Sequence, residues 1–243
     1  MKSLVVCVVT LATFCSGLQL PSGFKKCDKR RSDFNQCLSD AVYDTLRILD
    51  KPVKSHGLPS LYDVEFPPDA VIEVGNSTYG LTQKFSRFRL VGLSKPQSVT
   101  ARLDFGPVTS TLTIEASFAE LTWECEYEAR GTLVLLPLDV TTFLEYNMDH
   151  PTFTFTIKLE EYEKGTTYFR VIDSEFDMPA LGVRVDFKQL FSNKVLNDEF
   201  NSAMTEKGLQ GLHHFKHLQA HLAPYLGSIV SNFLDKVPVA ELF

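Results

Sequence analysis

The sequence predicts an α+β fold in which a strongly curved antiparallel β-sheet wraps around a long C-terminal α-helix, with a short N-terminal helix before it. Two observations carry this prediction. From Asn193 to Phe243, apolar residues recur mostly in steps of three and four, the spacing of one helical stripe. From Val71 to Phe191 the period is two, and no helical pattern interrupts the strands, so we expect antiparallel pairing.

Residues 1–17 have the pattern of a cleaved signal peptide. Lys2 gives a charged start, Leu4 to Phe14 form an apolar run, and Cys15-Ser16-Gly17 supply small residues before a cut. The run is too short to cross a bilayer, and no later stretch reaches about 18 apolar residues. We therefore expect a secreted, extracellular protein with a single domain over residues 18–243.

Charge narrows the range of partners. The formal net charge is −6, and loss of Lys2 with the signal would make it one unit more negative. Nucleic acid and anionic membranes require positive charge, so neither is expected as a partner. The sequence does not indicate a membrane receptor, and we expect a monomer.

Three cysteines remain after the predicted signal: Cys27, Cys37 and Cys125. In an oxidising compartment the close pair, Cys27 and Cys37, is expected to form a disulfide that ties the N-terminal arm to the first helix. Cys125 is interpreted as a buried thiol within a strand, with a reactive or intermolecular cysteine as the alternative. Asn76-Ser77-Thr78 is an N-glycosylation sequon, so Asn76 is a candidate glycosylation site.

The N-terminal third contains one predicted helix. After a basic, loop-like arm from Leu18 to Arg31, Ser32 is expected to cap a helix that runs to about Asp50. Its apolar face consists of Phe34, Leu38, Ala41, Val42, Leu46 and Leu49. His56 to Pro68 is rich in proline and is expected to be an extended linker.

The strands follow from alternation. The two clearest strands extend from Val108 to Phe118 and from Leu121 to Ala129. The apolar residues change from even to odd positions between them, so we expect a turn or bulge at Ala119-Glu120. Earlier strands are expected at Val71–Val74, Leu81–Leu93 and Val99–Phe105, and later ones around Phe155 and Val185.

The C-terminal stretch also carries four histidines at helical spacing: His213, His214, His217 and His221. The i, i+4 pairs among them can chelate Zn²⁺. The interpretation adopted is a polar helix face; a pH-sensitive contact and a metal site are the alternatives. We expect no metal and no cofactor.

The apolar face of the sheet offers more surface than one helix stripe covers, which allows an internal cavity. Candidate wall residues from the strands are Trp123, Tyr127, Leu133, Leu135, Phe153, Phe155 and Ile157. From the helix they are Leu212, Phe215, Leu222, Ile229 and Phe233. For each of these residues, a place in an ordinary packed core is an equally good interpretation.

No nucleophile elbow, P-loop, Rossmann glycine pattern or Cys-x-x-Cys pair occurs in the sequence, so we do not expect an enzyme. The function predicted from the residues is that of a secreted carrier for a hydrophobic small molecule. The alternative is a secreted interaction module with a packed core and no ligand.

Several segments, in order, match a known family. They are the Cys27…Cys37 pair before a helix, Gly57-Leu58-Pro59-Ser60-Leu61-Tyr62-Asp63, Tyr127-Glu128-Ala129-Arg130-Gly131-Thr132-Leu133, Leu136-Pro137-Leu138, Leu190-Phe191-Ser192-Asn193 and Val237-Pro238-Val239-Ala240-Glu241-Leu242-Phe243. The chain thus resembles the insect takeout and haemolymph juvenile-hormone-binding proteins of the tubular lipid-binding superfamily. This resemblance implies a curved sheet around a long helix and an apolar tunnel for a terpenoid, fatty acid or similar lipid. Cys125 has no partner for the second disulfide of the juvenile-hormone carriers, so the resemblance implies an apolar ligand in general rather than juvenile hormone in particular.

Overall fold

The computed structural model describes residues 17–68, 71–76, 80–133, 136–206 and 223–243. In chain order its elements are α1 (Phe34–Ile48), the 3₁₀ turn η1 (Lys54–His56), β1 (Asp63–Glu65), β2 (Ile72–Asn76), β3 (Leu81–Val91), β4 (Ser98–Asp104), β5 (Thr109–Ser117), β6 (Glu120–Leu133), β7 (Leu136–Asp149), β8 (Thr152–Glu163), β9 (Thr167–Asp177), β10 (Gly182–Phe187), α2 (Lys194–Glu206), a helix at 223–234 and α4 (Val239–Leu242).

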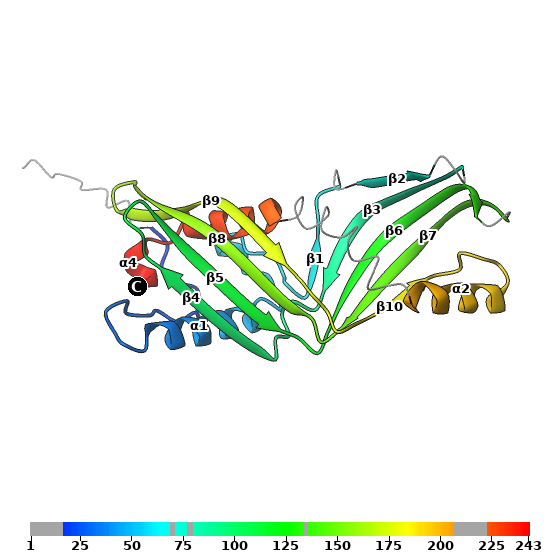
Figure 1. The fold of residues 1–243 in the computed structure, drawn as a ribbon. Coiled ribbons are helices and arrows are strands. Elements are labelled where there is room, and N and C mark those ends of the chain that lie inside the picture. Colours follow the sequence, from blue (N-terminus) through cyan, green and yellow to red (C-terminus); the bar gives the residue numbers. More distant parts are fainter. Residues whose placement is uncertain (1–16, 69–70, 77–79, 134–135, 207–222) are drawn as a thin grey trace, which may run out of the picture.

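The strands form two antiparallel sheets rather than one. A six-stranded sheet has the order β1-β3-β6-β7-β10, with β2 also paired to β3, and a four-stranded sheet has the order β4-β5-β8-β9. Figure 1 shows the two sheets meeting where the chain passes from one to the other and diverging from there. This region of chain crossings is called the waist below. The predicted α+β class and antiparallel pairing are confirmed, and the expected curvature is divided between two sheets.

The parity switch in the sequence marks a passage between the sheets. The chain leaves the four-stranded sheet at Ser117 and enters the six-stranded sheet at Glu120. The backbone N–H of Phe118 donates to the carbonyl of Pro151, and that of His150 donates to the carbonyl of Ala119. The turn predicted at Ala119-Glu120 is therefore part of the waist.

Three other connections also pass from one sheet to the other: β3 to β4, β7 to β8 and β9 to β10. They lie close enough to bond to one another. The N–H of Thr152 donates to the carbonyl of Pro179, and that of Leu181 donates to the carbonyl of Asp149. Backbone hydrogen bonds thus link neighbouring passages across the waist.

The N-terminal helix forms close to where the sequence predicts it, but Ser32 is not its cap. The N-cap residue is Asp33, whose side chain makes no capping hydrogen bond. Its carboxylate accepts hydrogen bonds from Arg31 instead, at 2.8 Å. The local ion pair thus competes with the helix end for the Asp33 carboxylate.

Two described pieces of the C-terminal stretch pack on different sheets. On α2, Asn201 Oδ1 accepts from the N–H of Phe187, and Thr205 Oγ1 accepts from that of Val185, both on β10. The 223–234 helix lies on the other sheet, where Ser174 of β9 donates to the carbonyl of Ala223 at 2.9 Å. The predicted long helix is therefore described in these two pieces, and residues 207–222 lie outside the described residues.

The predicted disulfide is confirmed. Cys27 and Cys37 are bonded with a Cα–Cα distance of 5.8 Å, and they tie the N-terminal arm to α1. The N–H of Cys27 also donates to the carbonyl of Leu242, and that of Leu18 to the carbonyl of Lys236. The arm is thereby held between α1 and the C-terminal segment. In the described part of the chain, every helix is too short or too polar to cross a bilayer.

Candidate ligand-binding cavity

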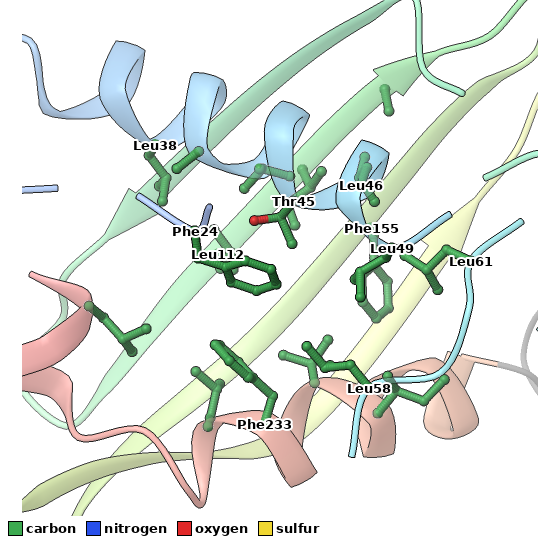
Figure 2. A pocket seen from close by; sticks show the side chains of 18 of the residues that line it. Phe24, Leu38, Thr45, Leu46, Leu49, Leu58, Leu61, Leu112, Phe155 and Phe233 are labelled. Atoms are coloured by element: carbon green, nitrogen blue, oxygen red, sulfur yellow. The ribbon is translucent and has the colours of Figure 1, made fainter. Parts of the chain in front are cut away.

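A cavity of about 270 Å³ lies between the four-stranded sheet, α1 and the 223–234 helix. Figure 2 shows side chains from all three converging on it, among them Leu46 of α1, Leu112 of β5 and Phe233. The N-terminal arm supplies Phe24, and the segment after η1 supplies Leu58 and Leu61. Two helices and one sheet face thus enclose a space at one end of the molecule.

The sheet wall follows from strand alternation. On β5, Leu112, Ile114 and Ala116 share one face, and all three line the cavity. Their register places Ala116 opposite Phe153 and Ile114 opposite Phe155 on β8. A small residue beside a large one leaves room at this point of the wall.

The helix wall comes from the predicted apolar face of α1. The lining residues of α1 and of its C-cap, Leu49, repeat at steps of three, one, three, one and three, which is one stripe of a helix: Leu38, Ala41, Val42, Thr45, Leu46 and Leu49. From the 223–234 helix the lining residues are Leu226, Ile229, Val230, Phe233 and Leu234. The remaining lining residues are Leu20, Lys25, Cys27, Leu93, Leu103, Phe118, Leu159, Phe169, Leu242 and Phe243.

The wall is almost wholly hydrophobic. Among the 29 described residues that line it, all are hydrophobic except Lys25 and Thr45. Lys25 Nζ lies 2.5 Å from Asp44 Oδ2, and both side chains reach solvent. The hydrogen bond to Asp44 raises the pKa of Lys25 above its ordinary value, so the ammonium group of this ion pair stays charged.

This arrangement is suited to burying an apolar molecule. A water in a cavity needs two to four polar partners, and apolar cavities of about 150 Å³ are known to stay dry and accept benzene. Among the residues that line this cavity, none forms the nucleophile–base pair that covalent catalysis requires. The chemistry available here is desolvation and shape.

Four of the predicted wall residues meet at the cavity: Phe153, Phe155, Ile229 and Phe233. Ile157, on the same strand as Phe155, is fully buried but is not among the lining residues. The side chain of Leu133 and the residues Leu135, Leu212, Phe215 and Leu222 lie outside the described residues.

Trp123 and Tyr127 are placed elsewhere. Both belong to β6 in the six-stranded sheet and are buried there. Trp123 stacks on Phe66 at 5.3 Å, and Tyr127 lies 4.9 Å from Phe187, ring centre to ring centre. Sequence alternation grouped β5 and β6 on one apolar face, but the passage at Phe118 puts their faces in different sheets.

Sequence reasoning missed the α1 wall. The stripe of α1 was visible in the sequence but was assigned no role beyond packing. Thr45 falls on the same stripe as Ala41 and Leu49 but, being polar, does not belong to the predicted apolar face. Phe24 of the arm and Phe243 offered no periodic signal, since each reaches the cavity through tertiary contacts.

Other predicted sites fall partly outside the described residues. Asn76 ends β2, but its side chain and the rest of the sequon are not described. The histidines at positions 213, 214, 217 and 221 also lie outside. Within the described ranges, no group of three or more His, Cys, Asp or Glu side chains could hold a metal ion. Cys125 is buried and unpaired with another cysteine.

Fold and cavity together define the class: an α+β protein of two antiparallel sheets, one of which closes with helices over an apolar cavity. The chain belongs to the haemolymph juvenile hormone binding protein family, whose model matches residues 3–243. The resemblance stated from the sequence is thereby confirmed.

A solved structure agrees on the fold. The crystal structure of Epiphyas postvittana Takeout 1 is similar, with a TM-score of 0.65 and 16% sequence identity over 89% of this chain and 98% of that chain. A lipopolysaccharide binding protein also matches, with a TM-score of 0.34 and 11% identity over 81% of this chain and 39% of that chain, which is too distant to carry an argument. A search among curated proteins found no match.

Proposed function

We propose that this protein is a secreted carrier that binds one hydrophobic small molecule, such as a terpenoid or fatty-acid derivative, in the cavity between α1, the four-stranded sheet and the 223–234 helix. The observation that carries the proposal is the composition of the wall: of the lining residues that the structure describes, only Lys25 and Thr45 are not hydrophobic. Membership of a family described as hormone-binding supports the same function. Secretion is supported by the signal-like pattern of residues 1–17 and by the Cys27–Cys37 disulfide.

The size of the cavity limits the ligand. Its volume of about 270 Å³ is near the lower end of the range for small-molecule sites, roughly 300–1,000 Å³. Burial of about 300 Å² of apolar ligand surface, at about 25 cal/mol per Å², contributes roughly 7 kcal/mol before the entropic costs of binding. A carrier therefore needs no strong polar contact to hold such a ligand.

The first test is native mass spectrometry of protein from a eukaryotic secretion host, followed by organic extraction. We expect a stoichiometric apolar molecule that is lost on denaturation. Added ligand at about 100 times its Kd should stabilise the fold by about 2.7 kcal/mol, a rise in Tm of about 5–11 °C. An apo mass with no uptake of terpenoids or fatty acids would favour the interaction module instead.

A variant locates the site. Leu112→Trp places a larger side chain in the cavity, whereas Thr113→Trp, its neighbour on β5, points to the opposite face of the sheet. We expect Leu112→Trp to weaken uptake of N-phenyl-1-naphthylamine at least about tenfold, the loss of roughly 1.4 kcal/mol of binding energy, and Thr113→Trp to leave it unchanged. Equal binding by the two variants would place the ligand elsewhere.

A further inference from the structure

Thr45 occupies an unusual place in α1. It lies on the inward stripe of the helix, one turn from Ala41 and one turn from Leu49, where the other positions are hydrophobic. Figure 2 shows its side chain pointing from α1 into the cavity, with the hydroxyl oxygen among carbon-only side chains. The sequence thus puts a hydroxyl group at a position that packing alone would fill with an aliphatic residue.

This hydroxyl differs from that of Ser39 on the same helix. The Ser39 hydroxyl donates to the carbonyl of Asn35 and accepts from the N–H of Ala101. The Thr45 hydroxyl makes no side-chain hydrogen bond with any residue that the structure describes. Thr45 is half-buried, and among the described residues no fully buried side-chain polar atom lacks a partner, so its hydroxyl is not sealed in the core. A ligand that offers a partner can therefore gain a hydrogen bond there.

Neither water nor an ion is a good partner for it. One hydroxyl supplies fewer polar contacts than a cavity water requires. Lys25, the one charged residue in the described part of the wall, forms an ion pair with Asp44 at 2.5 Å. A negatively charged head group inside the cavity would therefore meet a neutral hydroxyl and no unpaired cation among the described lining residues.

We infer that Thr45 is the specificity-determining residue of this cavity, and that its hydroxyl hydrogen-bonds the single polar group of an uncharged, oxygen-bearing hydrophobic ligand. This inference rests on the proposed carrier function. The fitting class is a hydrocarbon body with one ketone, ester, ether or hydroxyl oxygen. The Thr45 hydroxyl donates to that oxygen, and the hydrophobic wall buries the rest of the ligand.

The competing role is local. By rotating about χ1, a helical threonine can donate to the carbonyl four residues earlier, here that of Ala41. The hydroxyl would then be satisfied by the helix itself and would not distinguish one ligand from another. The two roles differ in how affinity depends on the ligand.

Three ligands of equal chain length separate them: decane, 2-decanone and decanoate, each measured by displacement of N-phenyl-1-naphthylamine. Thr45→Val keeps the shape of the side chain and removes the hydroxyl, and Thr45→Ser keeps the hydroxyl. We expect Thr45→Val to weaken 2-decanone about two- to tenfold, the range of one neutral hydrogen bond, and to change decane by less than about twofold. Thr45→Ser should retain the preference of the natural protein, and decanoate should bind most weakly throughout.

Equal changes for decane and 2-decanone in Thr45→Val, or none in either, would overturn the role of Thr45 while leaving the carrier function in place. Tightest binding of decanoate would overturn the preference for an uncharged ligand. If none of the three ligands displaces the probe from the natural protein, the carrier function itself fails. Thr45→Ala serves as a second hydroxyl-free variant should the Tm of Thr45→Val show that valine disturbs α1.

Discussion

The hydroxyl of Ser39 on α1 accepts a hydrogen bond from the backbone N–H of Ala101 on β4 at 2.8 Å. β4 is an end strand of the four-stranded sheet, and this bond satisfies an N–H that its neighbour β5 cannot reach. Ser39 and Ala101 are both buried, so α1 closes the sheet edge as well as the cavity.

Ser39→Ala should therefore destabilise the protein by about 1–3 kcal/mol, because it leaves a buried N–H without a partner. The corresponding fall in Tm is about 2–12 °C for a chain of this size. Ser32→Ala is the matched control: Ser32 is exposed and does not cap the helix, and its effect should stay within about 0.5 kcal/mol. Equal Tm values for the two variants would show that the bond to Ala101 contributes nothing.

Loss of the disulfide should lower stability by roughly 3 kcal/mol, because the link between Cys27 and Cys37 constrains the unfolded chain. Cys27→Ser combined with Cys37→Ser should then melt about 6–12 °C lower. Since the arm supplies Phe24 to the cavity wall, probe affinity should fall as well. The comparison is the natural protein with and without dithiothreitol, whose melting curves should differ by the same amount.

Cys125 should be unreactive until the protein unfolds. It is buried, and desolvation raises the pKa of its thiol to about 12. At pH 8 the reactive thiolate would be only on the order of 10⁻⁴ of the population. Ellman's reagent added to protein lacking residues 1–17 should label no cysteine in buffer and one in guanidinium chloride. Rapid labelling in buffer would instead support a reactive cysteine.

Alkaline conditions should destabilise the six-stranded sheet. Burial raises the pKa of Tyr127 and of Tyr146 from 10.0 to about 12, with nearby Cys125 adding to the effect. Between about pH 10 and about pH 12 the unfolded tyrosines lose protons that the folded ones keep, so stability is full below pH 10 and declines as pH rises. The loss approaches about 3 kcal/mol per tyrosine.

The measurement is the urea midpoint at pH 9 and at pH 11.5, in the natural protein and in Tyr146→Phe. The variant should lose less stability over this interval because it has one ionisable group fewer. An identical loss would assign the alkaline effect to other groups.

Local patterns in the sequence predict the elements well. The strand at Leu81, the helix from Phe34 and the disulfide partners all follow from alternation, helical spacing and cysteine separation, which are local properties. What alternation cannot predict is the sheet to which a strand belongs. Leu112 and Trp123 are both apolar positions of alternating runs in the sequence. They nevertheless lie in different sheets, because the two residues at Phe118-Ala119 redirect the chain.

The cavity residues also divide into those that local sequence patterns predict and those that they do not. Phe153 and Phe155 could be chosen because they alternate on one strand. The wall contributed by α1 could have been proposed from its stripe, and Thr45 from its polarity within that stripe. Phe24 could not, because an irregular arm reaches the cavity through the disulfide and through hydrogen bonds to distant residues.

The four passages of the chain across the waist have a consequence for how the molecule can be divided. Each sheet is assembled from separate stretches of sequence, so no continuous fragment contains one complete sheet without strands of the other. β5, for instance, pairs with β8, and β6 and β7 of the other sheet lie between these two strands in the sequence. We therefore expect isolated halves to remain unfolded and the intact chain to refold slowly, as high contact order dictates. An insertion or deletion in one sheet must also be accommodated by the strands that return from the other.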